Sequence, residues 1–246
     1  MKSILNIDSI TMKFGSLIAN EDVSFSIHEN EIVSLIGPNG AGKTTLFNCI
    51  TGFYKPCIGK VTYIDKDITG LPSYEICKLG ITRTFQIVKT LKEMTVKENI
   101  MTGAFLHTRN RNEALDIAEE VIALTDLSKR RDVKGGSLTI ADKKRVEIAR
   151  ALATKPHILM LDECMAGLNQ TEIKDVMKLC IKLKENGLSL LIVEHIMEAI
   201  MPISDNIVVL NAGRKIAEGA PTSIAEDDNV IKAYLGDNYH AKSQKH

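Results

Sequence analysis

The sequence predicts an α/β fold with a mostly parallel sheet, an N-terminal antiparallel β region and an inserted helical subdomain. Apolar runs at residues 32–36, 157–161 and 188–193 are typical of parallel strands that are covered on both faces. Short strand patterns at residues 5–12 and 23–27 precede them, and helical patterns fill much of residues 95–153. We expect one domain over residues 1–246, with an α/β core at 1–84 and 155–246 and a helical subdomain at about 85–154.

The composition favours a soluble chain with one large core. The 246 residues are 44% apolar and 25% charged, and 31 basic residues balance 31 acidic ones. This balance gives no global field for nucleic acid or an anionic membrane, so neither partner is expected. No apolar stretch approaches the roughly 20 residues that cross a bilayer, and the first residues lack a signal-peptide core. We therefore expect a cytoplasmic chain that does not insert into the membrane itself.

The cysteines predict reduced, packed thiols and no metal site, because no two of them form a C-x-x-C pair. They are Cys49, Cys57, Cys77, Cys164 and Cys180.

The N-terminal strands are expected to flank an aromatic residue on a turn, Phe14, which is followed by Gly15. The Phe14 ring is suited to stacking on a nucleotide base. Covering one end of a sheet is an equally good interpretation from these residues alone.

A glycine-rich turn between the strand at 32–36 and a helix that ends near Gly52 predicts a phosphate-binding loop. Such a turn directs backbone N–H groups at one point, and the helix adds its positive end. Lys43 can reach β- and γ-phosphates, and the Thr44 hydroxyl can ligate Mg²⁺. The expected ligands are ATP or another nucleoside triphosphate and Mg²⁺. The loop consists of Gly37, Pro38, Asn39, Gly40, Ala41, Gly42, Lys43, Thr44 and Thr45.

The middle of the chain changes from strands to helices. A strand at 59–64, a turn at 65–67 and a helix at 72–79 closed by Gly80 come first. Thr95 and Glu98 have the spacing of a capping box that opens a helix toward residue 105, and a second helix is expected at 113–124. The basic residues 129–131 are most simply a solvated face.

The α/β pattern then returns and places polar residues after two buried strands. Asp162 and Glu163 follow the first strand, and Glu194 and His195 follow the second. One carboxylate of the acidic pair can hold Mg²⁺ through water while the other polarises an attacking water, and His195 can hydrogen-bond a γ-phosphate. Helix capping for the pair and a structural role for the histidine remain alternatives. An amphipathic helix at 172–185, a hairpin at 207–217 and a helix at 230–234 complete the pattern.

These features together resemble the ATPase subunit of ATP-binding cassette (ABC) transporters over nearly the whole chain. In order and spacing, residues 37–45 look like the Walker A motif, residues 158–163 like Walker B, and residues 167–169 like the D-loop. Phe14 falls at the base-stacking position, Gln86 at the Q-loop glutamine and His195 at the switch histidine. Within the family, residues 83–86, 166–169 and 232–236 look like the ATPases of branched-chain amino acid importers.

The resemblance implies a P-loop NTPase core that hydrolyses ATP to power a membrane importer, with branched-chain amino acids or similar small polar solutes as cargo. Glu163 would be the general base, with His195 and Gln86 completing the catalytic set, and Thr44, Gln86 and Asp162 would surround the metal. The helical subdomain would dock on integral membrane permease subunits at the inner face of the cell membrane. A second ABC ATPase subunit, identical or different, would close over the nucleotide.

The family's signature Leu-Ser-Gly-Gly-Gln is altered. This chain has Leu138, Thr139, Ile140, Ala141 and Asp142 in its place. Thr139 keeps the hydroxyl and is a good N-cap, with Asp142 at the third helical position. The two glycines are lost, and Asp142 places negative charge near the partner's γ-phosphate, which Lys143 and Lys144 are expected to offset.

Two further departures are Cys164 in place of a proline and Asn169 in place of an aspartate. The departures bear on coupling between the two nucleotide sites more than on ATP binding.

Two other functions compete with a transport ATPase. A cytosolic ABC-type switch that acts on nucleic acid or ribosomes would use the same fold, but the neutral charge and single cassette weigh against it. A small-molecule kinase or GTPase would use the phosphate-binding loop but leaves Gln86, Glu163 and His195 unexplained, and the sequence has no Asn-Lys-x-Asp guanine motif.

Overall fold

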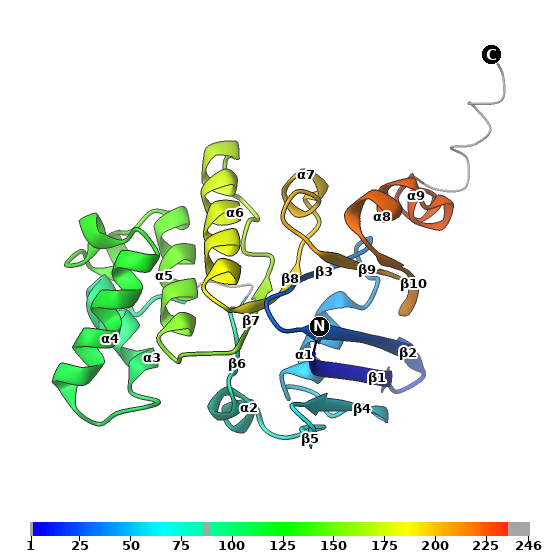
Figure 1. The fold of residues 1–246 in the computed structure, drawn as a ribbon, viewed down its shortest axis with the longest axis horizontal. Helices are drawn as coiled ribbons and strands as arrows, with labels where there is room; N and C mark the ends of the chain where they lie inside the picture. Colours follow the sequence, from blue (N-terminus) through cyan, green and yellow to red (C-terminus); the bar gives the residue numbers. More distant parts are fainter. Residues whose placement is uncertain (1, 86–88, 236–246) are drawn as a thin grey trace, which may run out of the picture. The chain divides into compact units, whose positions relative to one another are not determined.

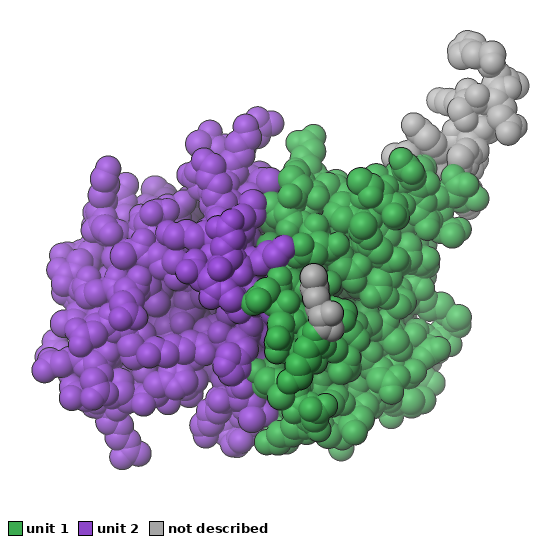
Figure 2. All heavy atoms as spheres, in the orientation of Figure 1, with its two compact units in different colours: residues 1–73, 191–246 green, residues 74–190 purple. Residues whose placement is uncertain are grey.

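The computed structural model describes residues 2–85 and 89–235, in two compact units. The first unit contains residues 1–73 and 191–246, and the second contains residues 74–190 (Figure 2). Strand β8 (Ser189–Val193), buried at every residue, runs across the boundary between them. Each unit is described by itself below.

The first unit begins with an antiparallel sheet in the order β2-β1-β4-β5. Its strands are β1 (Ser3–Phe14), β2 (Leu17–His28), β4 (Ile58–Tyr63) and the short β5 (Lys66–Asp67). Strands β1 and β2 are longer than the alternating runs predict, because the hairpin between them closes only at the Phe14–Leu17 pair. The predicted N-terminal antiparallel region is confirmed.

A second group of strands in this unit carries the phosphate-binding loop. Strand β3 (Ile32–Ile36) pairs in parallel with β9 (Asn206–Asn211), and β9 pairs antiparallel with β10 (Arg214–Gly219). Helix α1 (Lys43–Ile50) follows the loop, and β3 is buried at all of its residues. The helices α7 (Met197–Ile200), α8 (Pro221–Glu226) and α9 (Asp228–Leu235) complete the unit, with α8 and α9 packed on β10 (Figure 1).

The second unit combines a parallel strand pair with helices. Strand β6 (Ile81–Arg83) pairs in parallel with β7 (Ile158–Asp162), and α2 (Ser73–Leu79) precedes β6. Helices α3 (Val96–Ala104), α4 (Arg111–Leu124) and α5 (Ile140–Leu152) pack against one another (Figure 1). Two 3₁₀ turns, η1 (Ser128–Arg130) and η2 (Gly135–Ser137), lie between α4 and α5, and α6 (Gln170–Glu185) follows β7. The predicted fold class is confirmed, and the predicted subdomain bounds of 85–154 stay a prediction.

Helix starts follow the polar residues that the sequence offers. Thr95 and Glu98 form the predicted capping box of α3, and Asn169 and Glu172 form a second one at α6. Among the described residues no helix is long and apolar enough to cross a membrane.

None of the five cysteines, all of which lie in the described part of the chain, forms a disulfide; Cys49, Cys164 and Cys180 are buried and Cys57 is exposed. Burial raises the pKa of the Cys49 thiol to about 12, with Cys57 adding to the shift, so this thiol stays protonated at neutral pH.

Candidate functional site

The phosphate-binding loop is shaped by glycines that pass close to other backbone segments. Gly37 has φ 149° and Gly42 has φ 96°. A Cβ on Gly37 would lie 2.1 Å from the Leu210 carbonyl oxygen, and one on Gly42 would lie 2.4 Å from the Ala19 carbonyl oxygen. Both positions therefore exclude any side chain, and the loop is held on its protein side by strands β9 and β2.

Lys43 is the first residue of α1 and is buried. Its ammonium donates hydrogen bonds to the carbonyl oxygens of Gly37, at 2.7 Å, and Pro38, at 3.0 Å. These bonds hold the Lys43 side chain along the loop. Its ammonium therefore lies where it can contact phosphates that are bound by the loop's N–H groups. Thr44 is exposed at the next position. The structure thus brings together the loop residues that the sequence predicts.

Two side supports of the loop could not be inferred from the motif. The fully buried Asn20 of β2 donates from Nδ2 to the Gly42 carbonyl oxygen at 3.1 Å, and its Oδ1 has no hydrogen-bond partner among the described residues. The Gly213 N–H donates to the Ala41 carbonyl oxygen at 3.1 Å. On α9, burial raises the pKa of the Tyr234 phenol, and the backbone N–H of Gly37 acts in the opposite direction.

Phe14 lies at the end of β1 and is 42% exposed. Its ring meets Tyr54 edge-to-face with centroids 5.2 Å apart, and Tyr54 meets Phe53 in the same manner at 6.2 Å. The ring therefore belongs to a partly exposed aromatic cluster. Stacking of Phe14 on a nucleotide base stays a prediction.

In the second unit, Asp162 closes β7 and is almost completely buried. Its Oδ2 lies 3.5 Å from Nη2 of Arg83, and its backbone N–H donates to the Thr84 hydroxyl at 3.3 Å. Burial lowers the pKa of Arg83, while Asp162 and then Glu147 oppose that change. The carboxylate is thus held beside a guanidinium within the unit that contains both.

Glu163 follows in a left-handed backbone conformation with φ 47°. Its carbonyl oxygen accepts a hydrogen bond at 3.0 Å from the ammonium of Lys144, a buried residue of α5. Both residues line a small cavity together with Asp162 and Cys164. The sequence predicts the acidic pair but does not indicate that Lys144 contacts Glu163.

Glu147 is a second buried side chain of α5 that motif reasoning missed. Its Oε1 accepts a hydrogen bond from the Phe85 N–H at 3.1 Å and lies 3.9 Å from Nη2 of Arg150. Burial raises the pKa of this carboxyl, and the Phe85 N–H is the largest of the effects that oppose it, followed by Arg150, Lys144 and Arg83.

The altered signature begins α5 as predicted: the Thr139 hydroxyl accepts from the Asp142 N–H at 3.1 Å. Leu138 is buried and Ile140 is exposed, with Ala141 between Ile140 and Asp142 in the first turn. Asp142 Oδ2 lies 3.2 Å from Nε of Arg130.

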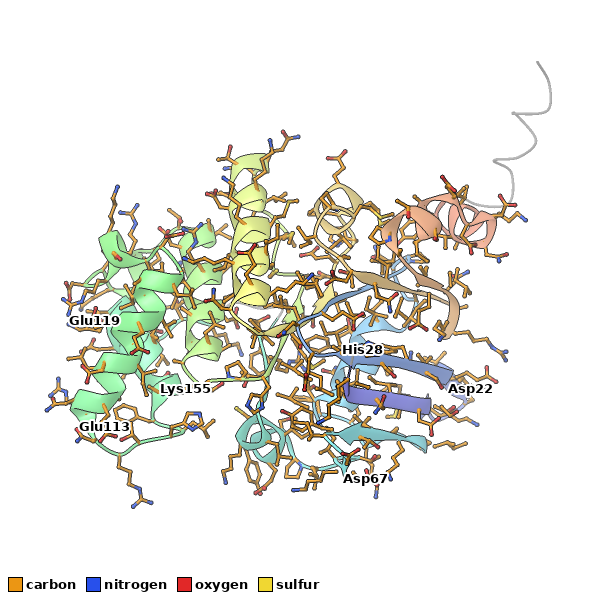
Figure 3. The ribbon with its side chains drawn as sticks, in the orientation of Figure 1. Asp22, His28, Asp67, Glu113, Glu119 and Lys155 are labelled. Atoms are coloured by element: carbon orange, nitrogen blue, oxygen red, sulfur yellow. The ribbon has the colours of Figure 1, made fainter. Side chains whose placement is uncertain are left out.

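The Lys144 ammonium donates a hydrogen bond to the Glu163 carbonyl, and the offset of the Asp142 charge by Lys143 and Lys144 stays a prediction. Arg130 is the cation that pairs with Asp142. The basic residues 129–131 include a second arginine with an acidic partner, because Arg131 pairs with Glu119. Figure 3 shows Glu119 on α4.

His195 follows β8 and is half exposed, with Nδ1 3.9 Å from Oε2 of the fully buried Glu194. Gln86 lies outside the described residues. Among residues 2–85 and 89–235, no three His, Cys, Asp or Glu side chains are grouped so that they could hold a metal ion. A metal here would need oxygen ligands from a nucleotide as well as from the chain.

The sequence profile of a family described as ABC transporter matches residues 20–166. The chain belongs to the ABC transporter family. A second profile, described as branched-chain amino acid ATP-binding cassette transporter, matches residues 214–240 of this ATPase. Membership makes it an ATP-binding subunit that hydrolyses ATP to power transport.

Relatives of this ABC ATPase match over almost their full length. The high-affinity branched-chain amino acid transport ATP-binding protein BraF of Pseudomonas aeruginosa is 41% identical, over 96% of this chain and 99% of the relative. LivG of Salmonella typhimurium, which has the same description, is 43% identical over 95% and 98%.

Two solved structures show the same fold. An ATP-binding cassette of an ABC transporter in its ADP conformation has a TM-score of 0.87 at 34% identity, covering 96% of this chain and all of that one. A dimeric cassette in a post-hydrolysis state with bound ADP and Pi has a TM-score of 0.79 at 27% identity, covering 89% and 99%.

Proposed function

We propose that this ABC ATPase powers the import of branched-chain amino acids or similar small polar solutes. The observation that carries the proposal is the match of residues 214–240 to the profile of branched-chain amino acid cassettes. The relatives at 41% and 43% identity carry the same description. The comparisons favour this function over the alternative of a switch that acts on nucleic acid or ribosomes.

Uptake of labelled leucine tests the proposed cargo. The gene is expressed with its neighbouring permease and binding-protein genes in a bacterial strain that lacks its own branched-chain amino acid importer. We expect leucine uptake with the native chain and none with Lys43→Ala, which serves as the matched inactive control. Uptake of a different solute class, with leucine at background, would refute the cargo while leaving ATP-driven transport intact.

For catalysis we assign roles to three residues by resemblance to the family. Lys43 neutralises charge on the β- and γ-phosphates, Glu163 accepts a proton from the attacking water, and His195 hydrogen-bonds the γ-phosphate. The half-exposed position of His195 after β8 leaves its ring accessible for that role. Gln86 is assigned by resemblance to metal contact and signalling.

Mg²⁺ fits the oxygen donors that the chain offers. Thr44, exposed in the first turn of α1, and Asp162, at the end of β7, are the proposed ligands together with Gln86. When bound, the ion supplies charge neutralisation at the phosphates. The hydroxyl and carboxylate are hard oxygen ligands of the kind that Mg²⁺ prefers, which supports this assignment over a softer metal.

For partners we propose a second ABC ATPase subunit and integral membrane permease subunits, with the chain peripheral on the cytoplasmic face. The dimeric cassette among the similar structures supports the first. A cavity in the second unit supports the second: it is lined by Phe85, Thr102 and Arg150, and Phe85 is 49% exposed beside it. An exposed aromatic beside charged side chains suits a permease segment that is partly apolar.

Site-directed cross-linking tests this docking. Thr102→Cys should cross-link to permease cysteines in membranes, whereas Lys178→Cys, on the exposed side of α6, should not. Equal cross-linking from both positions would refute docking at the cavity.

A further inference from the structure

Two segments of the second unit are fastened to the same helix, α5. The Lys144 ammonium donates to the carbonyl oxygen of Glu163, directly after β7, and the Glu147 carboxylate accepts from the N–H of Phe85, two residues after β6. Lys144 and Glu147 are three residues apart, so they lie on one face of the helix. Both are buried, which makes these bonds hard for water to replace.

The backbone that Lys144 contacts is an unfavourable one. Glu163 has φ 47°, a left-handed conformation in which the Cβ of an ordinary residue crowds the following carbonyl. Such a conformation persists only when surrounding contacts impose it, and it is concentrated at functional sites. A hydrogen bond to the Glu163 carbonyl fixes the following peptide plane, and with it the direction in which the Glu163 side chain leaves the backbone.

We propose that Lys144 is a positioning residue that holds Glu163 in its left-handed conformation and so directs the carboxylate at the attacking water. The proposal rests on the proposed role of Glu163 as general base. It also gives α5 two tasks, because the Thr139 cap at its start belongs to the segment that, by resemblance to the family, would face a partner's nucleotide. A shift of α5 on nucleotide binding would reach the base through Lys144, which lies about one and a half turns of helix from Thr139.

A purely structural role for Lys144 is the competing interpretation, because a buried carbonyl needs a donor wherever it lies. The two interpretations differ in what they predict for chemistry at equal stability. Lys144→Met keeps an unbranched stem of similar length and removes the donor. Lys144→Arg restores a cationic donor, and Lys178→Met on the exposed face of α6 is the matched control for loss of a lysine.

Three measurements on the purified full-length protein test the proposal. In Lys144→Met we expect the single-turnover rate of phosphate release to fall by about tenfold or more while the Kd for ATP changes by less than about twofold. Lys144→Arg should recover part of the rate, and Lys178→Met should match the native chain. Amide hydrogen exchange in the peptide that contains Glu163 and Cys164 should accelerate in Lys144→Met and not in Lys178→Met.

The double variant separates this proposal from the assignment of the base. If Lys144 acts through Glu163, adding Lys144→Met to Glu163→Gln should slow phosphate release no further. A native rate in Lys144→Met, or a loss that follows the fall in melting temperature equally in Lys144→Met and Lys144→Arg, would overturn the proposal. A native rate in Glu163→Gln would instead remove Glu163 as base, and the exchange measurement would then still report whether Lys144 holds the backbone.

Discussion

Replacing Asn20 by leucine should stabilise the protein, although it removes a hydrogen bond. The two side chains branch alike at Cγ, so the change swaps two polar atoms for two methyl groups with little change of shape. The lost bond from Nδ2 to the Gly42 carbonyl oxygen, 3.1 Å long, costs about 0.5–1.5 kcal/mol. That carbonyl is not left unsatisfied, because it also accepts from the Leu46 N–H at 3.0 Å.

The gain comes from the other end of the amide. Oδ1 of Asn20 is buried and has no hydrogen-bond partner among the described residues, a condition that costs about 1–3 kcal/mol. The difference favours leucine by about 1 kcal/mol. For a chain of this size that amounts to an increase of about 2–4 °C in melting temperature.

Calorimetric melting without nucleotide measures this change, because a bound nucleotide would add its own stabilisation. Asn20→Asp is the control: it keeps the shape but places a buried carboxylate against the Gly42 carbonyl, so it should melt below the native chain. If Asn20→Leu also melts below the native chain, the reasoning is wrong, and the bond to Gly42 contributes more than the unpaired oxygen costs.

Three further substitutions test the site. Lys43→Ala should weaken ATP binding and abolish phosphate release, and native turnover would remove the phosphate-loop assignment. Arg130→Ala should weaken ATP-driven dimerisation, measured by sedimentation, because the charge of Asp142 loses its partner. Adding Asp142→Gln to this variant should restore dimerisation. If neither variant changes dimerisation, Asp142 is a helix-cap residue only. Glu163→Gln should bind ATP, hydrolyse it about 10²–10⁴-fold more slowly than the native chain and elute as a dimer in size-exclusion chromatography. A monomer that holds uncleaved ATP would instead show that the segment from Leu138 to Asp142 cannot close on ATP without other subunits.

The fold was predictable where local chemistry decides it. A few neighbouring residues determine the local backbone conformation at three places: the glycine-rich turn after β3, the capping box at Thr95 and the N-cap at Thr139. The short helices α7 and α8 were not predicted, because segments of four and six residues show no helical period.

The contacts around the site were less predictable, because they join residues far apart in sequence. Lys144 and Lys143 are neighbours of Asp142 along the chain, but α5 turns Lys144 inward to Glu163, and Arg130 reaches Asp142 from a 3₁₀ turn before the helix. Asn20 is a single polar residue in a strand pattern, with no motif to mark it. Sequence spacing gives the residue types of a site, while the direction of each side chain depends on packing between elements.

The contacts of Leu210 and Gly213 with the phosphate-binding loop determine when this loop can be completed during synthesis of the chain. Residues 37–45 leave the ribosome early, but the carbonyl that lies against Gly37 belongs to strand β9, and the N–H that bonds Ala41 belongs to the turn that follows it. Pairing of β3 with β9 likewise waits for residues 206–209. Such long-range closure is slow and comes late in synthesis. A nascent chain released before that turn would carry the complete motif without the contacts that hold the loop on its protein side.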